Sequence, residues 1–174
     1  MERAFDLYRK SLERNRGPVK RAKEVRVGSE VVAKVKKVSL KRSCPQHGGL
    51  MFLWACLWML REIEVRSMKV RDILWSDEGK WAAIKLPISK NGQVGAGVRR
   101  TLKCRGRDNC IDVCPLKVAK AVVAPAKNKS NTLGMPLLTD SKSLFVTKRG
   151  VVNSWKALFG ATVLGHSARR SGAM

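Results

Sequence analysis

Residues 50–60 read LMFLWACLWML and form the one long apolar run of the chain. A membrane-spanning helix needs about 20 apolar residues, so this shorter run predicts a helix buried in a globular core. The run continues into residues 61–65, REIEV, which we expect to extend the same helix. The preceding segment, CPQHGG at residues 44–49, contains Pro and Gly, which interrupt regular structure. We therefore predict that the folded domain begins at residue 44 and contains this helix in its core.

The composition is strongly basic. The 174 residues include 36 Lys and Arg against 13 Asp and Glu, which gives a formal net charge of +23. Such a surface repels itself unless it meets a polyanion, so nucleic acid or an anionic membrane face is the expected partner class. The hydrophobic share of 44% excludes a disordered acidic tail and a collagen-like chain, but not a ribosomal or histone-like packing protein.

The first 43 residues carry 14 Lys and Arg against 5 Asp and Glu, and we predict a basic arm that precedes a domain of residues 44–174. Two apolar sets with helical spacing, separated by a Gly-Pro pair, predict two short amphipathic helices in this arm. The second set is Val27, Val31, Val35 and Val38. We expect the arm to order on DNA or on a neighbouring domain; the alternative is a solvated, partly disordered leader.

After about residue 80 the spacing of apolar residues changes from the helical period to alternation. Alternating apolar residues predict a strand over Trp81–Ser89, Asn91-Gly92 is a strong hairpin signal, and a second strand is expected through Val98–Cys104. Residues 105–143 contain three prolines and little sustained period, so most of them are predicted as loop. A final helix is expected after Thr147 as its cap. Its predicted buried stripe is Val151, Val152, Trp155, Leu158 and Phe159.

The order helix, hairpin, loop, helix predicts an α+β fold that is mainly α, with one small β-hairpin or sheet. The tryptophans at positions 54, 58 and 155 are expected in the core and not as platforms for base stacking.

Three segments carry side chains suited to phosphodiester chemistry. Arg61 leaves the apolar helix, and Glu64 one turn along can brace its guanidinium. Lys90 lies where the first strand enters its hairpin. His166 and Arg169 form an H-x-x-R box within GHSARRSGA. Two guanidinium groups can bind the non-bridging oxygens of a phosphate and supply positive charge where negative charge develops.

In this order the segments resemble the catalytic domain of tyrosine recombinases, the phage-integrase-like enzymes of mobile elements. The GHSARRSGA wording is similar to their eukaryotic, retroelement-associated branch, and the resemblance covers about residues 48–174. It implies DNA binding with ancestry in site-specific recombination and integration, through a phosphotyrosyl intermediate. No metal and no other cofactor is implied, because the arginines neutralise the phosphate.

The resemblance also implies individual roles. Arg61 and Arg169 would clamp the scissile phosphate, and His166 would donate a hydrogen bond to it or manage the proton of the nucleophile. Lys90 would protonate the departing 5′ oxygen. Arg170, the basic residue after the box, is implied in DNA binding.

The chain departs from the family at the nucleophile, which is a tyrosine downstream of the H-x-x-R box. The sequence ends at Met174, and its only tyrosine is Tyr8, in the basic arm. Strand cleavage by this chain alone is therefore not expected, and whether it is an enzyme stays open. The expectation is a truncated or decayed recombinase, or a fragment of a larger product, with residues 1–43 as a remnant of the core-binding domain.

Five cysteines and the absence of a secretory leader in MERAFDLYRK predict free thiols in a reducing compartment. Zinc ligands could be drawn from Cys104, Cys110, Cys114, Cys44 and His47. The spacings match no usual zinc knuckle, however, so we expect reduced thiols and no bound metal.

Two functions from different classes remain. The first is the recombinase-like domain that retains phosphate binding; the second is a basic nucleic-acid-binding or structural protein without catalytic ancestry. The expected partner is DNA and not a membrane, with self-association on DNA left open. Basic clusters such as KVKK at residues 34–37 suit nuclear import signals, so the nucleus is the expected location.

Overall fold

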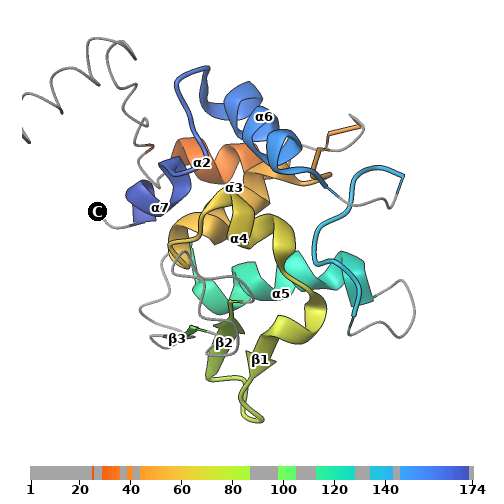
Figure 1. The fold of residues 1–174 in the computed structure, drawn as a ribbon. Helices are drawn as coiled ribbons and strands as arrows, with labels where there is room; N and C mark the ends of the chain where they lie inside the picture. Colours follow the sequence, from red (N-terminus) through yellow and green to blue (C-terminus); the bar gives the residue numbers. More distant parts are fainter. Residues whose placement is uncertain are drawn as a thin grey trace, which may run out of the picture.

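Helix α3 (Gly48–Leu57) lies at the centre of the molecule and packs against five other helices. These are α2 (Ser29–Val35), α4 (Glu62–Ser67), α5 (Pro115–Lys127), α6 (Lys148–Phe159) and α7 (Ser167–Gly172). The structure, a computed structural model, describes residues 25, 29–35, 39–40, 44–86, 98–104, 113–127, 134–142 and 146–172. About half of these residues are helical, and a small antiparallel sheet of three strands completes a mixed α/β fold. Figure 1 shows α5 and the sheet on one side of α3 and α4, and α2, α6 and α7 on the other.

The apolar run forms the predicted core helix. Every residue of α3 from Gly48 to Cys56 is buried, as are Trp54, Trp58 and Trp155, which confirms the core placement of these tryptophans. Because water is excluded from all sides of α3, the helix can be apolar around its whole circumference. Within the described part of the chain, no helix has the length and apolar character needed to cross a membrane.

The expected extension of this helix through residues 61–65 is wrong. The helix ends at Leu57, Met59 adopts a left-handed backbone with φ of 50°, and a new helix, α4 (Glu62–Ser67), follows. A left-handed residue commonly terminates a helix. Arg61 has an extended backbone and caps α4, and its N–H donates to Oε2 of Glu64 at 2.8 Å. This contact satisfies a backbone donor at the start of α4.

Part of the predicted basic arm packs onto the core. Helix α2 (Ser29–Val35) confirms the helix that the valine spacing predicts, and Val31 is fully buried. Gly49 allows the close approach of α2 to α3, since a Cβ at this position would overlap the carbonyl of Lys34. The valine face of α2 therefore contributes to the same hydrophobic core as α3.

The two predicted strands are confirmed as β2 (Trp81–Lys85) and β3 (Arg99–Lys103), which pair antiparallel. The end of the first predicted strand and the Asn91-Gly92 turn lie outside the described residues. A third strand, β1 (Ile73–Trp75), pairs with the other edge of β2 and was not expected, because three residues are too few to show a period. A short 3-10 helix, η1 (Val70–Asp72), leads into it.

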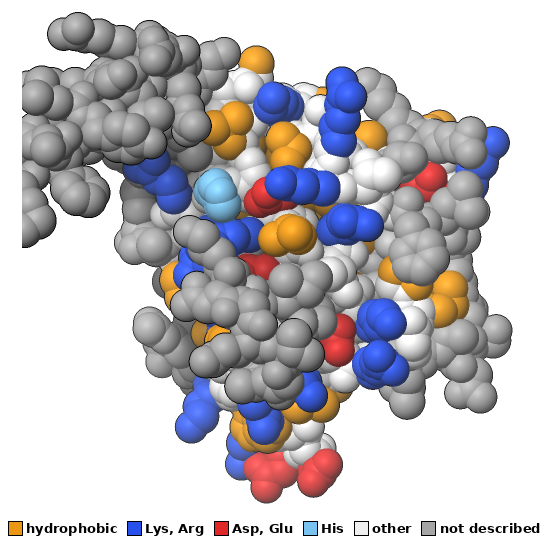
Figure 2. All heavy atoms as spheres, viewed as in Figure 1, with side chains coloured by type: hydrophobic (Ala, Val, Ile, Leu, Met, Phe, Trp, Pro, Cys, Tyr) orange, Lys and Arg blue, Asp and Glu red, His pale blue; other side chains and the backbone are white. Residues whose placement is uncertain are grey.

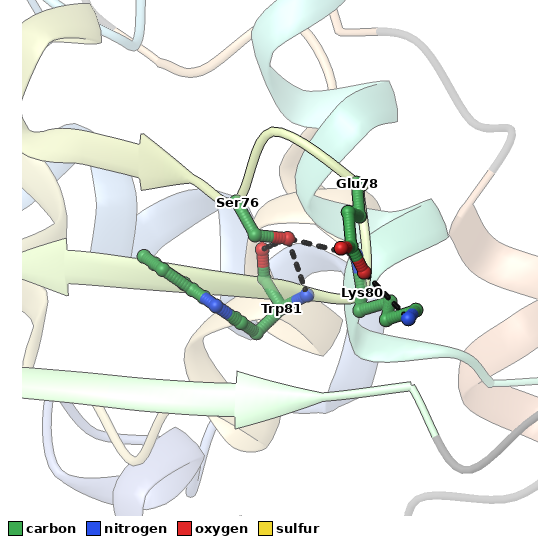
Figure 3. A network of polar contacts seen from close by, with 4 residues as sticks. All are labelled: Ser76, Glu78, Lys80 and Trp81. Atoms are coloured by element: carbon green, nitrogen blue, oxygen red, sulfur yellow. Dashed lines mark hydrogen bonds and ion pairs between the residues drawn. The ribbon is translucent and has the colours of Figure 1, made fainter.

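The β1–β2 turn is held by the hydroxyl of Ser76 (Figure 3). Its Oγ accepts hydrogen bonds from the N–H groups of Lys80, at 2.8 Å, and Trp81, at 3.1 Å. Lys80 also pairs with Glu78, and both side chains are largely exposed. Gly79 occupies the left-handed region, with φ of 66°, which suits a tight turn.

The predicted loop over residues 105–143 is wrong for its central part, where α5 (Pro115–Lys127) forms. Pro115 occupies the first helical position, where a backbone N–H would have no partner within the helix, so the N–H that proline lacks costs nothing there. Buried residues recur with helical spacing and pack against α3, and Pro125 lies close to the end of the helix. These residues are Leu116, Ala119, Val122 and Val123.

The final predicted helix is α6 (Lys148–Phe159), and Thr147 is its cap as expected, with Oγ1 accepting from the N–H of Gly150 at 2.9 Å. Val151, Trp155 and Phe159 are buried, whereas the other two residues of the predicted stripe are half-buried. Trp155 contacts Phe52 edge to face, which anchors α6 on α3.

Candidate functional site

Arg61 is held at the bend between α3 and α4. Its backbone caps α4, its side chain is partly buried, and its Nε is buried without a hydrogen-bond partner among the described residues. Glu64, which we expected to brace the guanidinium, binds the backbone N–H of Arg61 instead. The Glu64 carboxylate therefore fixes the backbone position of Arg61, and the guanidinium of Arg61 can bind another group.

The segment that carries the H-x-x-R box lies directly against this bend. The carbonyl of Gly165 accepts a hydrogen bond from the N–H of Glu62 at 3.3 Å. A Cβ at Gly165 would overlap the Glu62 carboxylate and lie 2.6 Å from its Oε1. Glycine lets the Glu62 carboxylate lie here without moving, and the hydrogen bond places the residue before His166 next to the residue after Arg61.

The box itself begins helix α7 (Ser167–Gly172), which packs against α3. Ser167, Ala168 and Ser171 are buried, and Ser171 Oγ accepts from the N–H of Val25 at 2.8 Å. These contacts anchor the segment on the core. His166 and Arg170 are exposed and Arg169 is half-buried, so the anchored helix presents polar side chains at the surface.

Arg100 on β3 joins the same site, although no motif in the sequence singles it out. Its Nη1 donates to the carbonyls of Trp58, at 2.5 Å, and Met59, at 2.6 Å. Burial lowers the pKa of the Arg100 guanidinium, the negative charge of Glu64 raises it, and the positive charges of Arg169 and Arg61 lower it further. Glu64, Arg169 and Arg61 are therefore near enough to Arg100 to affect its pKa.

We call Arg61, Arg100 and Arg169 the arginine cluster. The three residues come from the α3–α4 bend, from β3 and from α7. Glu64 is buried beside them and offsets part of their charge, but three guanidiniums exceed one carboxylate. An anion with several oxygens, such as a phosphate, would relieve the remaining repulsion and accept bidentate hydrogen bonds.

A second carboxylate lies at the edge of the cluster. Glu62 is buried, and its Oε1 lies 3.4 Å from Nζ of Lys148, the first residue of α6. Its Oε2 is buried with no hydrogen-bond partner in the described part of the chain. Figure 2 shows this mixture on one face, with many Lys and Arg side chains around a histidine and a few carboxylates.

Lys90, the hairpin lysine of the sequence prediction, lies outside the described residues, so the structure does not relate it to the arginine cluster. The strands on either side of the segment are in place, since the N–H of Leu86 donates to the carbonyl of Val98 at 2.9 Å.

The structure describes three of the four cysteines considered as zinc ligands. Across the described ranges, no group of three or more His, Cys, Asp or Glu side chains is placed to hold a metal ion. Cys104 and Cys114 lie close together, with their Sγ atoms 3.6 Å apart, and Cys44 is a free, buried thiol. Cys110 lies outside the described residues.

Comparison with known proteins identifies no family for this chain. No protein-family model matches it, and a search of curated proteins finds no match. The resemblance to tyrosine recombinases therefore depends on the sequence motifs alone.

Proposed function

We propose that this chain binds DNA through a phosphate site formed by Arg61, Arg169 and His166, in a domain that shares ancestry with tyrosine recombinases. The observation that carries the proposal is a backbone contact between the two segments: the N–H of Glu62, next to Arg61, donates to the carbonyl of Gly165, next to His166, at 3.3 Å. Two arginines carried by segments that contact each other suit the clamping of one phosphodiester, whereas a randomly basic surface would not require this contact.

Each side chain has a role consistent with its position. Arg61 and Arg169 are partly buried, so their hydrogen bonds to phosphate oxygens form where water competes less. His166 is exposed and can reach the same phosphate from outside, and Arg170 adds a solvent-facing charge for a neighbouring phosphate. A surface with net charge of +23 brings the DNA to the site over a long range.

Arg61→Ala and Arg169→Ala should each weaken binding to a short DNA duplex by about 10- to 100-fold, because each removes a charge-assisted, bidentate contact. The measurement is fluorescence anisotropy at several salt concentrations. The salt slope should also fall by about one phosphate contact per substitution. Arg66→Ala is the matched control, since Arg66 is exposed on α4 near Arg61, and it should cost less than about threefold.

The second candidate function is general polyanion binding without a dedicated site. Basic side chains spread over the face in Figure 2 favour it. It predicts that Arg61, Arg169 and Arg66 contribute equally, so equal losses for the three variants, with folding verified by circular dichroism, would reject the proposed phosphate site.

We expect Arg100 to position Arg61 by holding the α3–α4 bend, and not to contact the phosphate itself. Both hydrogens of its Nη1 are directed to the carbonyls of Trp58 and Met59, so Arg100→Ala should release the bend and weaken DNA binding about tenfold. In a double-mutant cycle, Arg100→Ala should cost little more once Arg61 is already Ala, because both changes disable the same contact. Additive losses in the double variant would contradict this positioning role.

A further inference from the structure

The thiols of Cys104 and Cys114 lie close together between β3 and α5. Cys104 directly follows β3, Cys114 directly precedes α5, and Cys114 Sγ lies 3.6 Å from Cys104 Sγ. Both backbones are anchored in regular structure. The N–H of Cys104 donates to the carbonyl of Lys80 at 3.0 Å, and the carbonyl of Cys114 accepts from the N–H of Val118 at 3.0 Å.

We propose that Cys104 and Cys114 are an oxidisable dithiol that a low-molecular-weight disulfide converts to an intramolecular disulfide. A disulfide has an S–S distance of about 2.05 Å, so the sulfurs must approach by only about 1.5 Å, which is within the range of side-chain rotation. Cys104 is half-exposed and Cys114 is buried, so the reagent reaches Cys104 first.

The reaction has two balanced exchanges. Cys104 loses its proton to solvent, its thiolate attacks one sulfur of the reagent, and the other half of the reagent leaves as a thiolate that takes up a proton. Cys114 then loses its proton and attacks the Cys104 sulfur of the mixed disulfide, which expels the second half of the reagent. Two protein thiols are oxidised, and one reagent disulfide is reduced to two thiols.

Other thiols of the described core do not compete well. Cys56 is fully buried in α3, and burial raises the pKa of its thiol to about 12, so it holds little thiolate at neutral pH. Cys44 is also buried. The selectivity of the pair thus follows from proximity and access, and it does not depend on the proposed DNA function.

The bond would tether β3 to α5, two elements that already pack together. Closing the ring between residues 104 and 114 removes conformational freedom from the unfolded chain, as in other short loops closed by a disulfide. The melting temperature should therefore rise by roughly 5–10 °C on oxidation, and a reductant should reverse the rise.

The test uses the full chain, oxidised with excess oxidised glutathione, alkylated and digested without reduction for mass spectrometry. A Cys104–Cys114 linked peptide, lighter than the two thiol peptides by two hydrogen atoms, is expected. Cys104→Ser and Cys114→Ser should each abolish both this peptide and the rise in melting temperature, whereas Cys110→Ser, the control, should retain them. A link from Cys110 in the native sequence in place of the Cys104–Cys114 link, or free Cys104 and Cys114 after treatment that fully oxidises a small dithiol, would overturn the proposal.

Discussion

Glu64→Ala should lower the free energy of unfolding by about 3 kcal/mol. The buried carboxylate of Glu64 accepts a hydrogen bond from the backbone N–H of Arg61 at 2.8 Å. Its negative charge raises the pKa of Arg100. Its removal leaves a backbone donor unsatisfied and takes away the buried negative charge that acts on Arg100. Urea denaturation followed by circular dichroism gives the difference.

Two further variants separate the causes. Glu64→Gln keeps an acceptor for the N–H of Arg61 but removes the charge, so it should lose less stability than Glu64→Ala. Glu78→Ala is the control for loss of a carboxylate at the surface, because its pair with Lys80 is largely exposed, and it should cost under about 1 kcal/mol. If Glu64→Ala were as mild as Glu78→Ala, the buried carboxylate would not be the counter-charge of the cluster.

Gly172→Ala should also destabilise the fold by about 3 kcal/mol, and it should displace α7. A Cβ at this position would overlap the carbonyl oxygen of Cys56 and lie 2.7 Å from its carbonyl carbon. These are backbone atoms of the buried helix α3, which cannot move aside like a side chain. The same denaturation measurement applies, and hydrogen exchange at α7 reports its displacement.

The matched control is Gly134→Ala. No atom lies within 4 Å of a Cβ built at Gly134, so this change should stay within about 0.5 kcal/mol. Because α7 carries Arg169, the proposed phosphate site further predicts that Gly172→Ala lowers DNA affinity, although Gly172 has no side chain to contact DNA. Native stability of Gly172→Ala would mean that α7 does not pack on α3 as the structure describes.

The elements that the sequence predicts well are those with a strong local pattern. The apolar run of residues 50–60 and the stripe of α6 each report burial through the pattern of neighbouring residues. Strand β2 forms as predicted, but it buries Ala82, Ala83 and Ile84 in succession and not one face alone. The cap at Thr147 is local too, since donor and acceptor are three residues apart.

The incorrect predictions have physical causes. The helix ends at Leu57, but the apolar sequence continues beyond it. Because the residues on both sides of Met59 are buried and apolar, the sequence gives no sign of the bend. Prolines in α5 suggested a loop, yet Pro115 is harmless at the first helical position. Glu64 has the spacing to reach either the guanidinium or the backbone of Arg61, and sequence alone does not distinguish the two.

The sequence by itself determined a basic chain with a buried apolar helix, a hairpin and a final capped helix, because charge and periodicity are properties of neighbouring residues. Only the tertiary structure decided that Arg100 holds the α3–α4 bend, that Gly172 lets α7 lie against α3, and that Gly165 lies beside Glu62. These contacts join residues far apart along the chain, where steric fit and charge act through space and leave no spacing to recognise.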